Sequence, residues 1–196
     1  MTVVVAADIH GSASWTRRLL EACEAEHASQ LLLLGDLLYH GPRNPLPEGY
    51  DPKETAMLLN SFAERIIAVR GNCDAEVDSL MLRFPLVESA MLFMDGLRFF
   101  CTHGHRSDLS DPSLPMGYDV LLSGHTHLYA GEKREGRYFF NPGSVSLPKG
   151  GNAHSYLVYR DHVCTIKDFS HAVLYSALAE KAGQPIDILE EEPVRA

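Results

Sequence analysis

The sequence lacks the features that would direct a chain to a membrane or to an oxidising compartment. No stretch approaches the roughly 20 apolar residues that a transmembrane helix requires. The N-terminal segment MTVVVAADIHGS has no basic region, and its apolar run is too short for a signal peptide. The four cysteines form no C-x-x-C pair and do not resemble a disulfide framework. We therefore expect a cytoplasmic protein with no membrane partner.

Basic residues are scarce as well. The chain has 17 Lys and Arg against 26 Asp and Glu, a formal net charge of -9, and no run of basic residues. Binding of nucleic acids depends on Lys and Arg that neutralise phosphates, so we expect no nucleic-acid polymer as a partner. A small-molecule substrate is the better expectation. The small size and the hairpins predicted below make a homo-oligomer a further possibility.

What is present suits one globular domain, because 45% of the 196 residues are hydrophobic. In the first half, short apolar runs alternate with helical patterns, as in a parallel α/β sheet. Ser12 or Ser14 can cap a first helix, and Asp51 followed by Pro52 can begin a second. The predicted strands of this half are 3–7, 31–34 and 66–69.

The second half consists of short strand-like runs separated by turns such as Asp95-Gly96 and Glu135-Gly136, which are typical of hairpins. We therefore expect two sheets packed face to face, with helices outside. A Pro- and Gly-rich loop at 39–52 follows Asp36, and a loop of that length in a compact domain is usually functional or disordered. The predicted strands of this half are 91–94, 97–101, 120–122, 137–140, 156–159 and 163–166.

Side chains that can bind metals follow the ends of five predicted strands. In open α/β sheets the carboxyl edge of the strands is where sites form, so these side chains should converge. Taken alone, a His at a strand end is more often structural and a Gly-Asp is a turn, but their coincidence favours a site. The candidates are Asp8, His10, Asp36, Asn72, His103, His125 and His127.

The residue types suit a pair of metal ions. Carboxylate and imidazole ligands favour Mn, Fe, Zn and related ions over a soft thiolate site. A carboxylate has two oxygens and can bridge two ions. Two ions roughly 3.5–4 Å apart can activate a water and stabilise both oxygens of an in-line displacement at phosphorus. The pattern therefore predicts hydrolysis of a phosphate ester by a metal-bound hydroxide.

The motifs DIHG, GD, GN, THGH and GHTH together resemble the calcineurin-like metallophosphoesterases. The segments LGDLLYHGPRNPLPEGY, VRGNCDAEVD and FNPGSVSLPKGGN resemble the small bacterial phosphodiesterases of that superfamily. The resemblance covers residues 1–169, which we interpret as a single metallophosphoesterase domain. Residues 170–196 match nothing and are treated as a C-terminal extension of unknown role.

The resemblance implies a four-layer α-β-β-α sandwich of two mixed β-sheets flanked by helices. It also implies two divalent metal ions, with manganese as a common activating ion, and two ligand sets that share Asp36. Asp36, Asn72 and His103 are the catalytic candidates, since metal ligands of this kind stabilise the charge of the transition state. One set is Asp8, His10, Asp36 and His127; the other is Asp36, Asn72, His103 and His125.

One departure from the family pattern concerns the third motif. Many members have Gly-Asn-His there, and that His is the presumed proton donor to the leaving group. Here Cys73 takes its place, and a thiol or thiolate is a poorer acid, so Cys73 is a less favoured catalytic candidate. The loss of the imidazole argues for phosphodiesters over alkyl phosphomonoesters. Asp74, which would orient the missing His, could instead form a salt bridge.

Further residues are candidates for substrate binding. They are His40, Arg43 and Asn44 in the loop after Asp36, and His105, which could equally hydrogen-bond a metal ligand. A turn that contains Asn141, Gly143 and Ser144 is expected to close one side of the pocket. Two alternatives to a phosphodiesterase remain: a phosphomonoesterase or protein phosphatase, and a binding scaffold that keeps the fold without catalysis.

Overall fold

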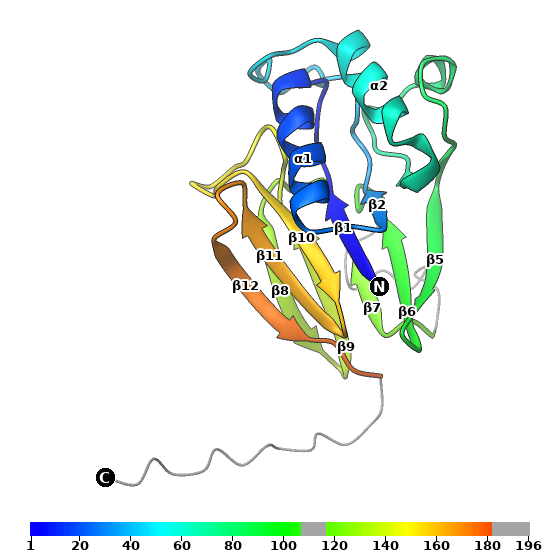
Figure 1. The fold of residues 1–196 in the computed structure, drawn as a ribbon, viewed down its shortest axis with the longest axis vertical. Helices are drawn as coiled ribbons and strands as arrows, with labels where there is room; N and C mark the ends of the chain where they lie inside the picture. The colour runs from blue at the N-terminus through cyan, green and yellow to red at the C-terminus, as the bar shows by residue number, and fades with distance from the viewer. Residues whose placement is uncertain (107–116, 182–196) are drawn as a thin grey trace, which may run out of the picture.

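Two mixed β-sheets pack face to face in the structure, a computed structural model that describes residues 1–106 and 117–181 (Figure 1). One sheet has seven strands in the order β12-β11-β10-β1-β2-β3-β4, and the other has five in the order β5-β6-β7-β9-β8. The strands are β1 (Thr2–Ala6), β2 (Gln30–Leu33), β3 (Ile66–Val69), β4 (Leu86–Val87), β5 (Ser89–Met94), β6 (Leu97–Thr102), β7 (Val120–Leu122), β8 (Tyr129–Arg134), β9 (Arg137–Pro142), β10 (Ser155–Arg160), β11 (Val163–Asp168) and β12 (Val173–Leu178).

Each sheet contains both parallel and antiparallel strands. Strands β1, β2, β3 and β4 run parallel to one another, whereas β10, β11 and β12 continue the sheet antiparallel. In the second sheet β6, β7 and β9 are parallel, and the hairpin partners β5 and β8 form the antiparallel edges. The parallel sheet predicted for the first half and the two-sheet sandwich are both confirmed.

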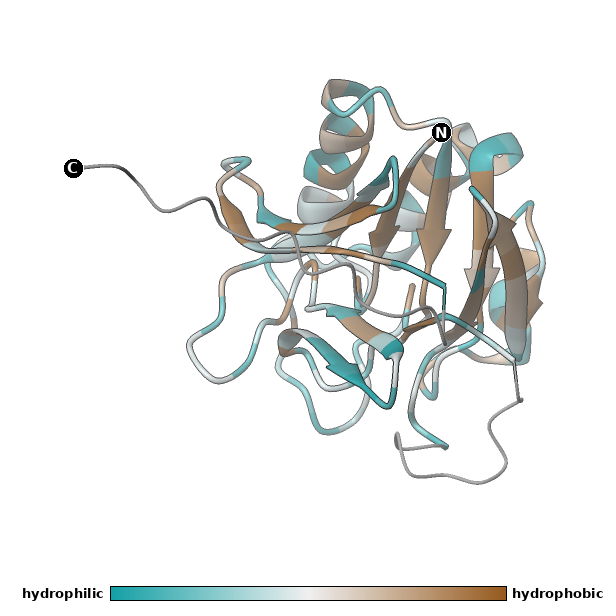
Figure 2. Cartoon of the chain, turned by 90° about the horizontal axis from the view of Figure 1, so that it is seen from below, coloured by the Kyte–Doolittle hydropathy of each residue, from teal (hydrophilic) through white to brown (hydrophobic). Residues whose placement is uncertain are grey.

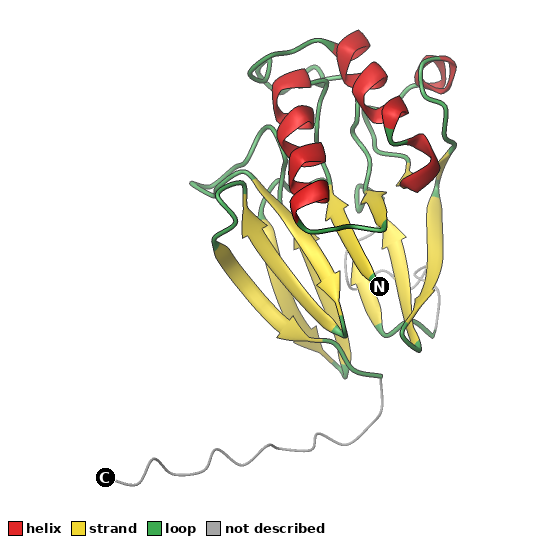
Figure 3. Cartoon of the chain, viewed as in Figure 1, coloured by secondary structure: helices red, strands yellow, loops and turns green. Residues whose placement is uncertain are grey.

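Two α-helices lie over the outer face of the seven-stranded sheet (Figure 3). Helix α1 (Ala13–Ala25) begins after Ser12, whose Oγ accepts the backbone N–H of Trp15 at 3.2 Å. Helix α2 (Pro52–Ser61) begins after Asp51, whose carboxylate accepts the N–H of Glu54 at 2.9 Å. Both predicted caps therefore form, and they satisfy N–H groups that a helix leaves unpaired. No helix among the described residues is long and apolar enough to cross a membrane.

The core has two layers because alternate residues of a strand point to opposite faces of the sheet. In β1, Val4 packs towards the helices, in a cluster that includes Leu19. Its neighbours Val3 and Val5 pack between the two sheets, in a cluster that includes Phe99. Figure 2 shows the resulting apolar strands, with hydrophilic residues gathered in the connecting loops. A rigid double layer thus supports the loops at the strand ends.

Three strands were not predicted. Strand β4 has only two residues, and β8, with the sequence YAGEKR, is too polar to read as a strand. Strand β12 pairs with β11 at the edge of the seven-stranded sheet, and Ala179 just beyond it is buried. The boundary expected at residue 169 therefore falls inside the sheet, because half-exposed edge strands lack a clear apolar pattern. Residues 182–196 of the expected extension lie outside the described residues.

Candidate metal centre

The carboxyl ends of β1, β2, β3, β6 and β7 meet at one edge of the sandwich, and all seven predicted ligands follow these ends. Asp8, His10 and His127 come together at the ends of β1 and β7. His10 Nε2 lies 3.2 Å from His127 Nε2 and 3.9 Å from Asp8 Oδ1. His127 Nε2 is 3.5 Å from the same Asp8 oxygen. These three side chains point their ligand atoms at one small volume.

The other predicted ligands gather around Asp36, which follows β2. His103 Nε2 lies 3.4 Å from Asp36 Oδ2 and 3.1 Å from Asn72 Oδ1. Asp36 Oδ2 is also 3.7 Å from His10 Nε2, so Asp36 faces both groups of ligands. The His125 ring stands 5.1 Å from the His103 ring, centroid to centroid. Asp36 thus lies between the two groups.

Three of the histidines are oriented by backbone carbonyl groups. His10 Nδ1 donates to Tyr39 O at 2.8 Å, His103 Nδ1 to Leu34 O at 2.6 Å, and His127 Nδ1 to Leu147 O at 2.6 Å. A proton on Nδ1 leaves the Nε2 lone pair free for a metal. Two such Nε2 atoms at 3.2 Å cannot hydrogen-bond each other. They fit two ligands of one cation, since ligands about 2.1 Å from an ion lie about that far apart.

Asp8 supplies an independent sign that the site suits a cation. Its side chain is fully buried, and Oδ1 has no hydrogen-bond partner among the described residues. Its other oxygen accepts the backbone N–H of His125 at 3.0 Å. Burial raises the pKa of Asp8 to about 8. A buried carboxylate oxygen without a partner is costly, and a metal ion removes that cost. The donor set therefore fits metal binding.

Burial and neighbouring charges shift the pKa values of the site residues in different directions. Burial disfavours a charged His103, but its hydrogen bond to Asp36 and the charges of Asp8 and Asp36 outweigh burial and raise its pKa to about 9. Burial would likewise raise the pKa of Asp36, yet the bond from His103 and its charge hold it well below the usual range. Burial lowers the pKa of His127 to about 4 and lowers that of His10. His10 and His127 are therefore neutral, as metal ligands must be.

The backbone of the centre is strained. Five of the seven predicted ligands adopt a positive φ, a region that residues other than glycine rarely enter and that Asn, Asp and His tolerate best. Such strain gathers at functional sites, where the surrounding fold enforces it. The five residues and their φ values are Asp8 (58°), His10 (50°), Asp36 (57°), His125 (68°) and His127 (61°).

Glycines before Asp36 and Asn72 let two motif loops touch. A Cβ on Gly71 would lie 2.1 Å from Asp36 Oδ1 and 2.3 Å from the Asp36 nitrogen. A Cβ on Gly35 would lie 2.5 Å from the nitrogen of Gly71. All three distances are shorter than any real contact, so only glycine fits at either position. The Gly-Asp and Gly-Asn motifs are therefore required for packing as well as for ligand geometry.

Asp74 contributes to the centre in a way that the sequence analysis missed. Its buried carboxylate accepts the backbone N–H groups of Asp36 at 2.8 Å, Leu37 at 2.7 Å and Gly71 at 2.7 Å. The predicted salt bridge does not form with any described residue; only the Asp74 backbone oxygen meets Arg70, at 3.4 Å. Asp74 instead joins the second and third motif loops. A carboxylate two residues after Asn72 was the available signal.

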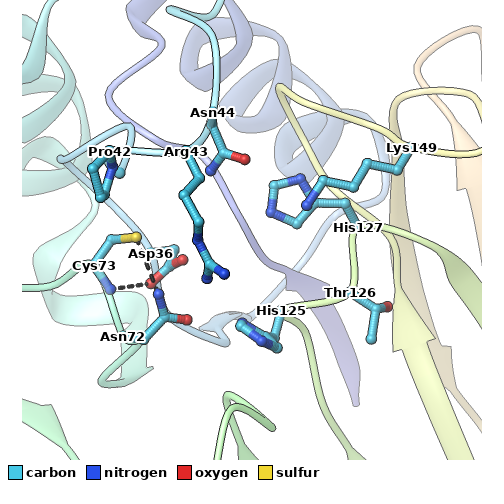
Figure 4. A pocket seen from close by; sticks show the side chains of 11 residues that line it. Asp36, Pro42, Arg43, Asn44, Asn72, Cys73, His125, Thr126, His127 and Lys149 are labelled. Carbon is cyan, nitrogen blue, oxygen red and sulfur yellow. Dashed lines mark hydrogen bonds between the residues drawn. The ribbon is translucent and has the colours of Figure 1, made fainter.

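A pocket of about 480 Å³ opens above the ligands (Figure 4). Of the four predicted substrate-binding residues, Arg43 and Asn44 line it, and Figure 4 shows both pointing into it. His40 does not line it, because its ring packs against Tyr39 and Tyr50. The lining residues are Asp36, Gly41, Pro42, Arg43, Asn44, Asn72, Cys73, His125, Thr126, His127 and Lys149.

Two further predictions, for His105 and for the turn that contains Asn141, differ from what the structure shows. His105 is absent from the pocket lining and lies beside the ligands, its ring 5.4 Å from that of His103. The turn with Asn141 does not line the pocket either. Asn141 Nδ2 donates to Gly124 O at 2.7 Å, and Ser144 Oγ donates to Asp8 O at 2.8 Å. These side chains hold the ligand loops from behind.

Cys73 lines the pocket beside Asp36, and its backbone N–H donates to Asp36 Oδ1 at 2.8 Å. Burial, together with the negative charge of Asp36, raises the pKa of the thiol to about 12. With only protein groups around it, the Cys73 side chain is therefore a neutral thiol rather than a thiolate. Asn72 Nδ2 contacts its sulfur at 3.2 Å.

Comparison with known proteins agrees with this geometry. Residues 1–162 match the model of the calcineurin-like phosphoesterase superfamily domain. The chain belongs to this family.

Among its relatives, the phosphodiesterase YfcE of Escherichia coli K12 is 47% identical over 168 residues, which span 85% of this chain and 91% of that protein. The solved structure of Yfce, described as a phosphoesterase from E. coli, superposes with a TM-score of 0.88 at 42% identity, covering 92% of this chain and all of the other. Vps29 of Entamoeba histolytica, solved with zinc, has a TM-score of 0.59 at 23% identity over 85% of this chain and 90% of that one, which shows a shared fold alone.

Proposed function

We propose that this protein hydrolyses phosphodiesters with the help of two divalent metal ions. Manganese is the metal that we expect at both positions. The observation that carries the proposal is the orientation of the ligand atoms. His10 and His127 face each other with unprotonated Nε2 atoms, and the buried Asp8 oxygen beside them has no partner among the described residues. A relative that shares 47% of its residues is named a phosphodiesterase.

The proposed ligand sets follow the two groups of side chains. Asp8, His10, Asp36 and His127 would hold one ion; Asp36, Asn72, His103 and His125 would hold the other. Asp36 faces both groups, which suits a bridging carboxylate. When bound, two such ions supply an activated water and neutralise negative charge at phosphorus.

The chain's own groups have separate tasks in this proposal. Asn72 and His125 are the less buried members of the set and line the pocket, so they can meet the phosphoryl oxygens directly. Arg43 reaches from the loop above towards Asp36 and His125 (Figure 4). A guanidinium there can bind a non-bridging phosphate oxygen and stabilise the charge of the transition state.

The neutral Cys73 explains why a diester is the favoured substrate. It stands where many family members have an imidazole, and a thiol with a pKa of about 12 is a poor proton donor. A monoester carries one more negative charge than a diester, and an alkyl leaving group needs protonation. Neither demand is met by Cys73. This argues against the phosphomonoesterase or protein phosphatase alternative, and the complete set of predicted ligands argues against a silent scaffold.

The test is hydrolysis of bis(p-nitrophenyl) phosphate and of p-nitrophenyl phosphate, which share a leaving group, after chelation and after addition of Mn²⁺, Zn²⁺ or Mg²⁺. We expect turnover of the diester only with added metal, and about two ions per chain by elemental analysis. Full activity in metal-free protein would exclude the proposed centre. A higher rate on the monoester would support the phosphatase alternative, and a metal-free chain after supply of Mn²⁺ would support the scaffold.

A further inference from the structure

Lys149 is a pocket residue to which neither the motifs nor the proposed metal centre gives a role. It lines the same pocket as Asn72 and His125, and its side chain extends from the wall opposite Cys73 towards His127 (Figure 4). Its side chain is exposed. The segment that carries it belongs to the FNPGSVSLPKGGN sequence. Because the pocket is proposed to bind phosphate esters, the ligand that suits a cation at its mouth is an anion.

The backbone of Lys149 is fixed to a predicted metal ligand. Its N–H donates to the carbonyl oxygen of His127 at 3.1 Å, while His127 Nδ1 donates to Leu147 O at 2.6 Å. Beyond it, Gly150 and Gly151 adopt positive φ values of 62° and 77° and turn the chain away. The start of the Lys149 side chain is thus held against the centre, and its ammonium group is left free to meet a ligand.

Lys149 and Arg43 have no acidic partner among the described residues, although many carboxylates are present. With a net charge of -9 the chain offers many carboxylates, and nine of its Lys and Arg side chains form ion pairs within the described parts of the chain. Neither Lys149 nor Arg43 has an ion pair or a side-chain hydrogen bond within 1–106 and 117–181. Both cations that line the pocket are therefore available to a bound anion.

The charge of the whole pocket exceeds what a simple phosphodiester needs. Two divalent ions would bring more positive charge than Asp8 and Asp36 neutralise, and Arg43 already reaches towards Asp36 and His125. A dialkyl phosphate carries a single negative charge. The charge of Lys149 acts on the Asp8 carboxyl, which the metal ions would neutralise, so Lys149 would then be left without a counter-charge. Complementary charge across a binding site is what gives specificity for a charged ligand.

We propose that Lys149 binds a second anionic group, a carboxylate or a phosphate, on the alcohol that the phosphodiester retains after cleavage. The substrate class is thus a phosphodiester with a further negative charge a few bonds from the scissile phosphorus. This inference rests on the proposed phosphodiesterase function and adds the feature of the substrate that the enzyme selects.

Three esters with the same p-nitrophenyl leaving group test the inference: n-propyl, 2-carboxyethyl and 2-phosphonoethyl p-nitrophenyl phosphate. In the wild-type protein with Mn²⁺, kcat/KM should be about tenfold higher for an anionic ester than for the propyl ester, the effect of one charge-assisted contact. The larger of the two anionic effects identifies the group that is bound. Lys149→Met should remove the preference, Lys149→Arg should largely retain it, and Lys53→Met, which removes an exposed lysine outside the pocket, should leave it intact.

A binding measurement separates this inference from the proposed function. Calorimetric titration of Mn²⁺-loaded protein with methylenediphosphonate and with methylphosphonate should give about tenfold tighter binding of the first, lost in Lys149→Met and kept in Lys53→Met. Equal affinities in wild type and Lys149→Met, or equal rates on the three esters, would overturn the inference. Failure to hydrolyse any of the esters, with the affinity difference present, would overturn the proposed function and leave the anion site in place.

Discussion

The candidate metal centre has a buried floor and an exposed rim, and the fold holds the two differently. The floor consists of Asp8, His10, Asp36, His103 and His127, each no more than 2% exposed and each fixed by hydrogen bonds or strained backbone. The rim consists of Arg43, Asn44, Asn72, His125 and Lys149, which are half-buried or exposed and line the pocket. In the proposed function the floor would hold most of the metal ligands, whereas the rim would carry the groups that choose the ester.

The largest effect is expected from the floor, at Asp36. Asp36→Ala removes the carboxylate that the two proposed ligand sets share, so it should lower metal content at both positions. Loss of several kcal/mol of transition-state stabilisation corresponds to roughly a 10³-fold fall in kcat/KM on bis(p-nitrophenyl) phosphate. The measurements are turnover and elemental analysis of the purified variant.

His27→Asn is the matched control for this prediction. His27 is exposed and adopts a positive φ that Asn tolerates, so this variant should keep wild-type rates and metal content. Near wild-type turnover and normal metal content in Asp36→Asn would show that Asp36 does not bridge two ions.

The next largest effect is expected at Asp74, which supports the floor. Its replacement should lower the stability of the protein rather than the catalytic rate. Asp74→Ala leaves three buried backbone N–H groups without their acceptor. Buried groups left unpaired cost about 1–3 kcal/mol each, so the free energy of unfolding should fall by at least about 3 kcal/mol. Asp74→Asn keeps one acceptor oxygen and should lose less. Equal stabilities of the two variants in urea titrations would contradict this role of Asp74.

Protons compete with metals for the floor, and this gives a pH dependence. Asp8, with a pKa of about 8, and His103, with a pKa of about 9, both hold protons at neutral pH that metal binding must displace. The apparent affinity for Mn²⁺ should therefore rise with pH up to about 8–9, by about tenfold per pH unit for each proton released. Asp8→Asn should make the rise less steep. A pH-independent affinity between pH 6 and pH 8 would contradict these protonation states.

The smallest effect is expected at Cys73, where the rim meets the floor. On a nitrophenyl diester the leaving group needs little protonation, so Cys73→Ala should change kcat/KM by less than about threefold. Cys73→His should raise hydrolysis of phosphomonoesters relative to diesters, because an imidazolium can bind the additional charge and donate a proton. If Cys73→Ala abolished activity with metals bound, the thiol would itself be catalytic. An unchanged ratio in Cys73→His would remove this explanation of the preference for diesters.

The floor could be located from the sequence because its residues follow regular elements. Strand β3 lies where the apolar run Ile66–Val69 predicts it, and Asn72 follows directly. The rim could not be located in this way. Whether His40 or Arg43 enters the pocket depends on how one loop packs. Tyr50, which packs against the His40 ring, is a neighbour in space that no periodicity reveals. Lys149 was missed for the same reason, since its role depends on a turn that folds back onto His127.

The edges of the fold escaped prediction for a related reason. Strands β8 and β12 pair on one side only and expose alternate or consecutive residues to water, so polar residues interrupt their patterns. Buried strands such as β1 are continuous apolar runs and were predicted with an error of one residue. Burial on both faces therefore makes a strand recognisable in the sequence, and the predicted ligands could be placed because they follow buried strands.

The left-handed backbone at five ligand positions limits which side chains could ever replace them. Glu, Gln and Cys also bind metals, but they tolerate a positive φ poorly, whereas Asp, Asn and His adopt it more readily. Replacement of Asp36 by Glu would thus be opposed by strain in the backbone, whichever metal was bound. Fewer residue types could therefore replace these five residues than coordination chemistry alone would allow. The sandwich of sheets, which enforces those dihedral angles, therefore restricts the side chains at these positions independently of any metal ion.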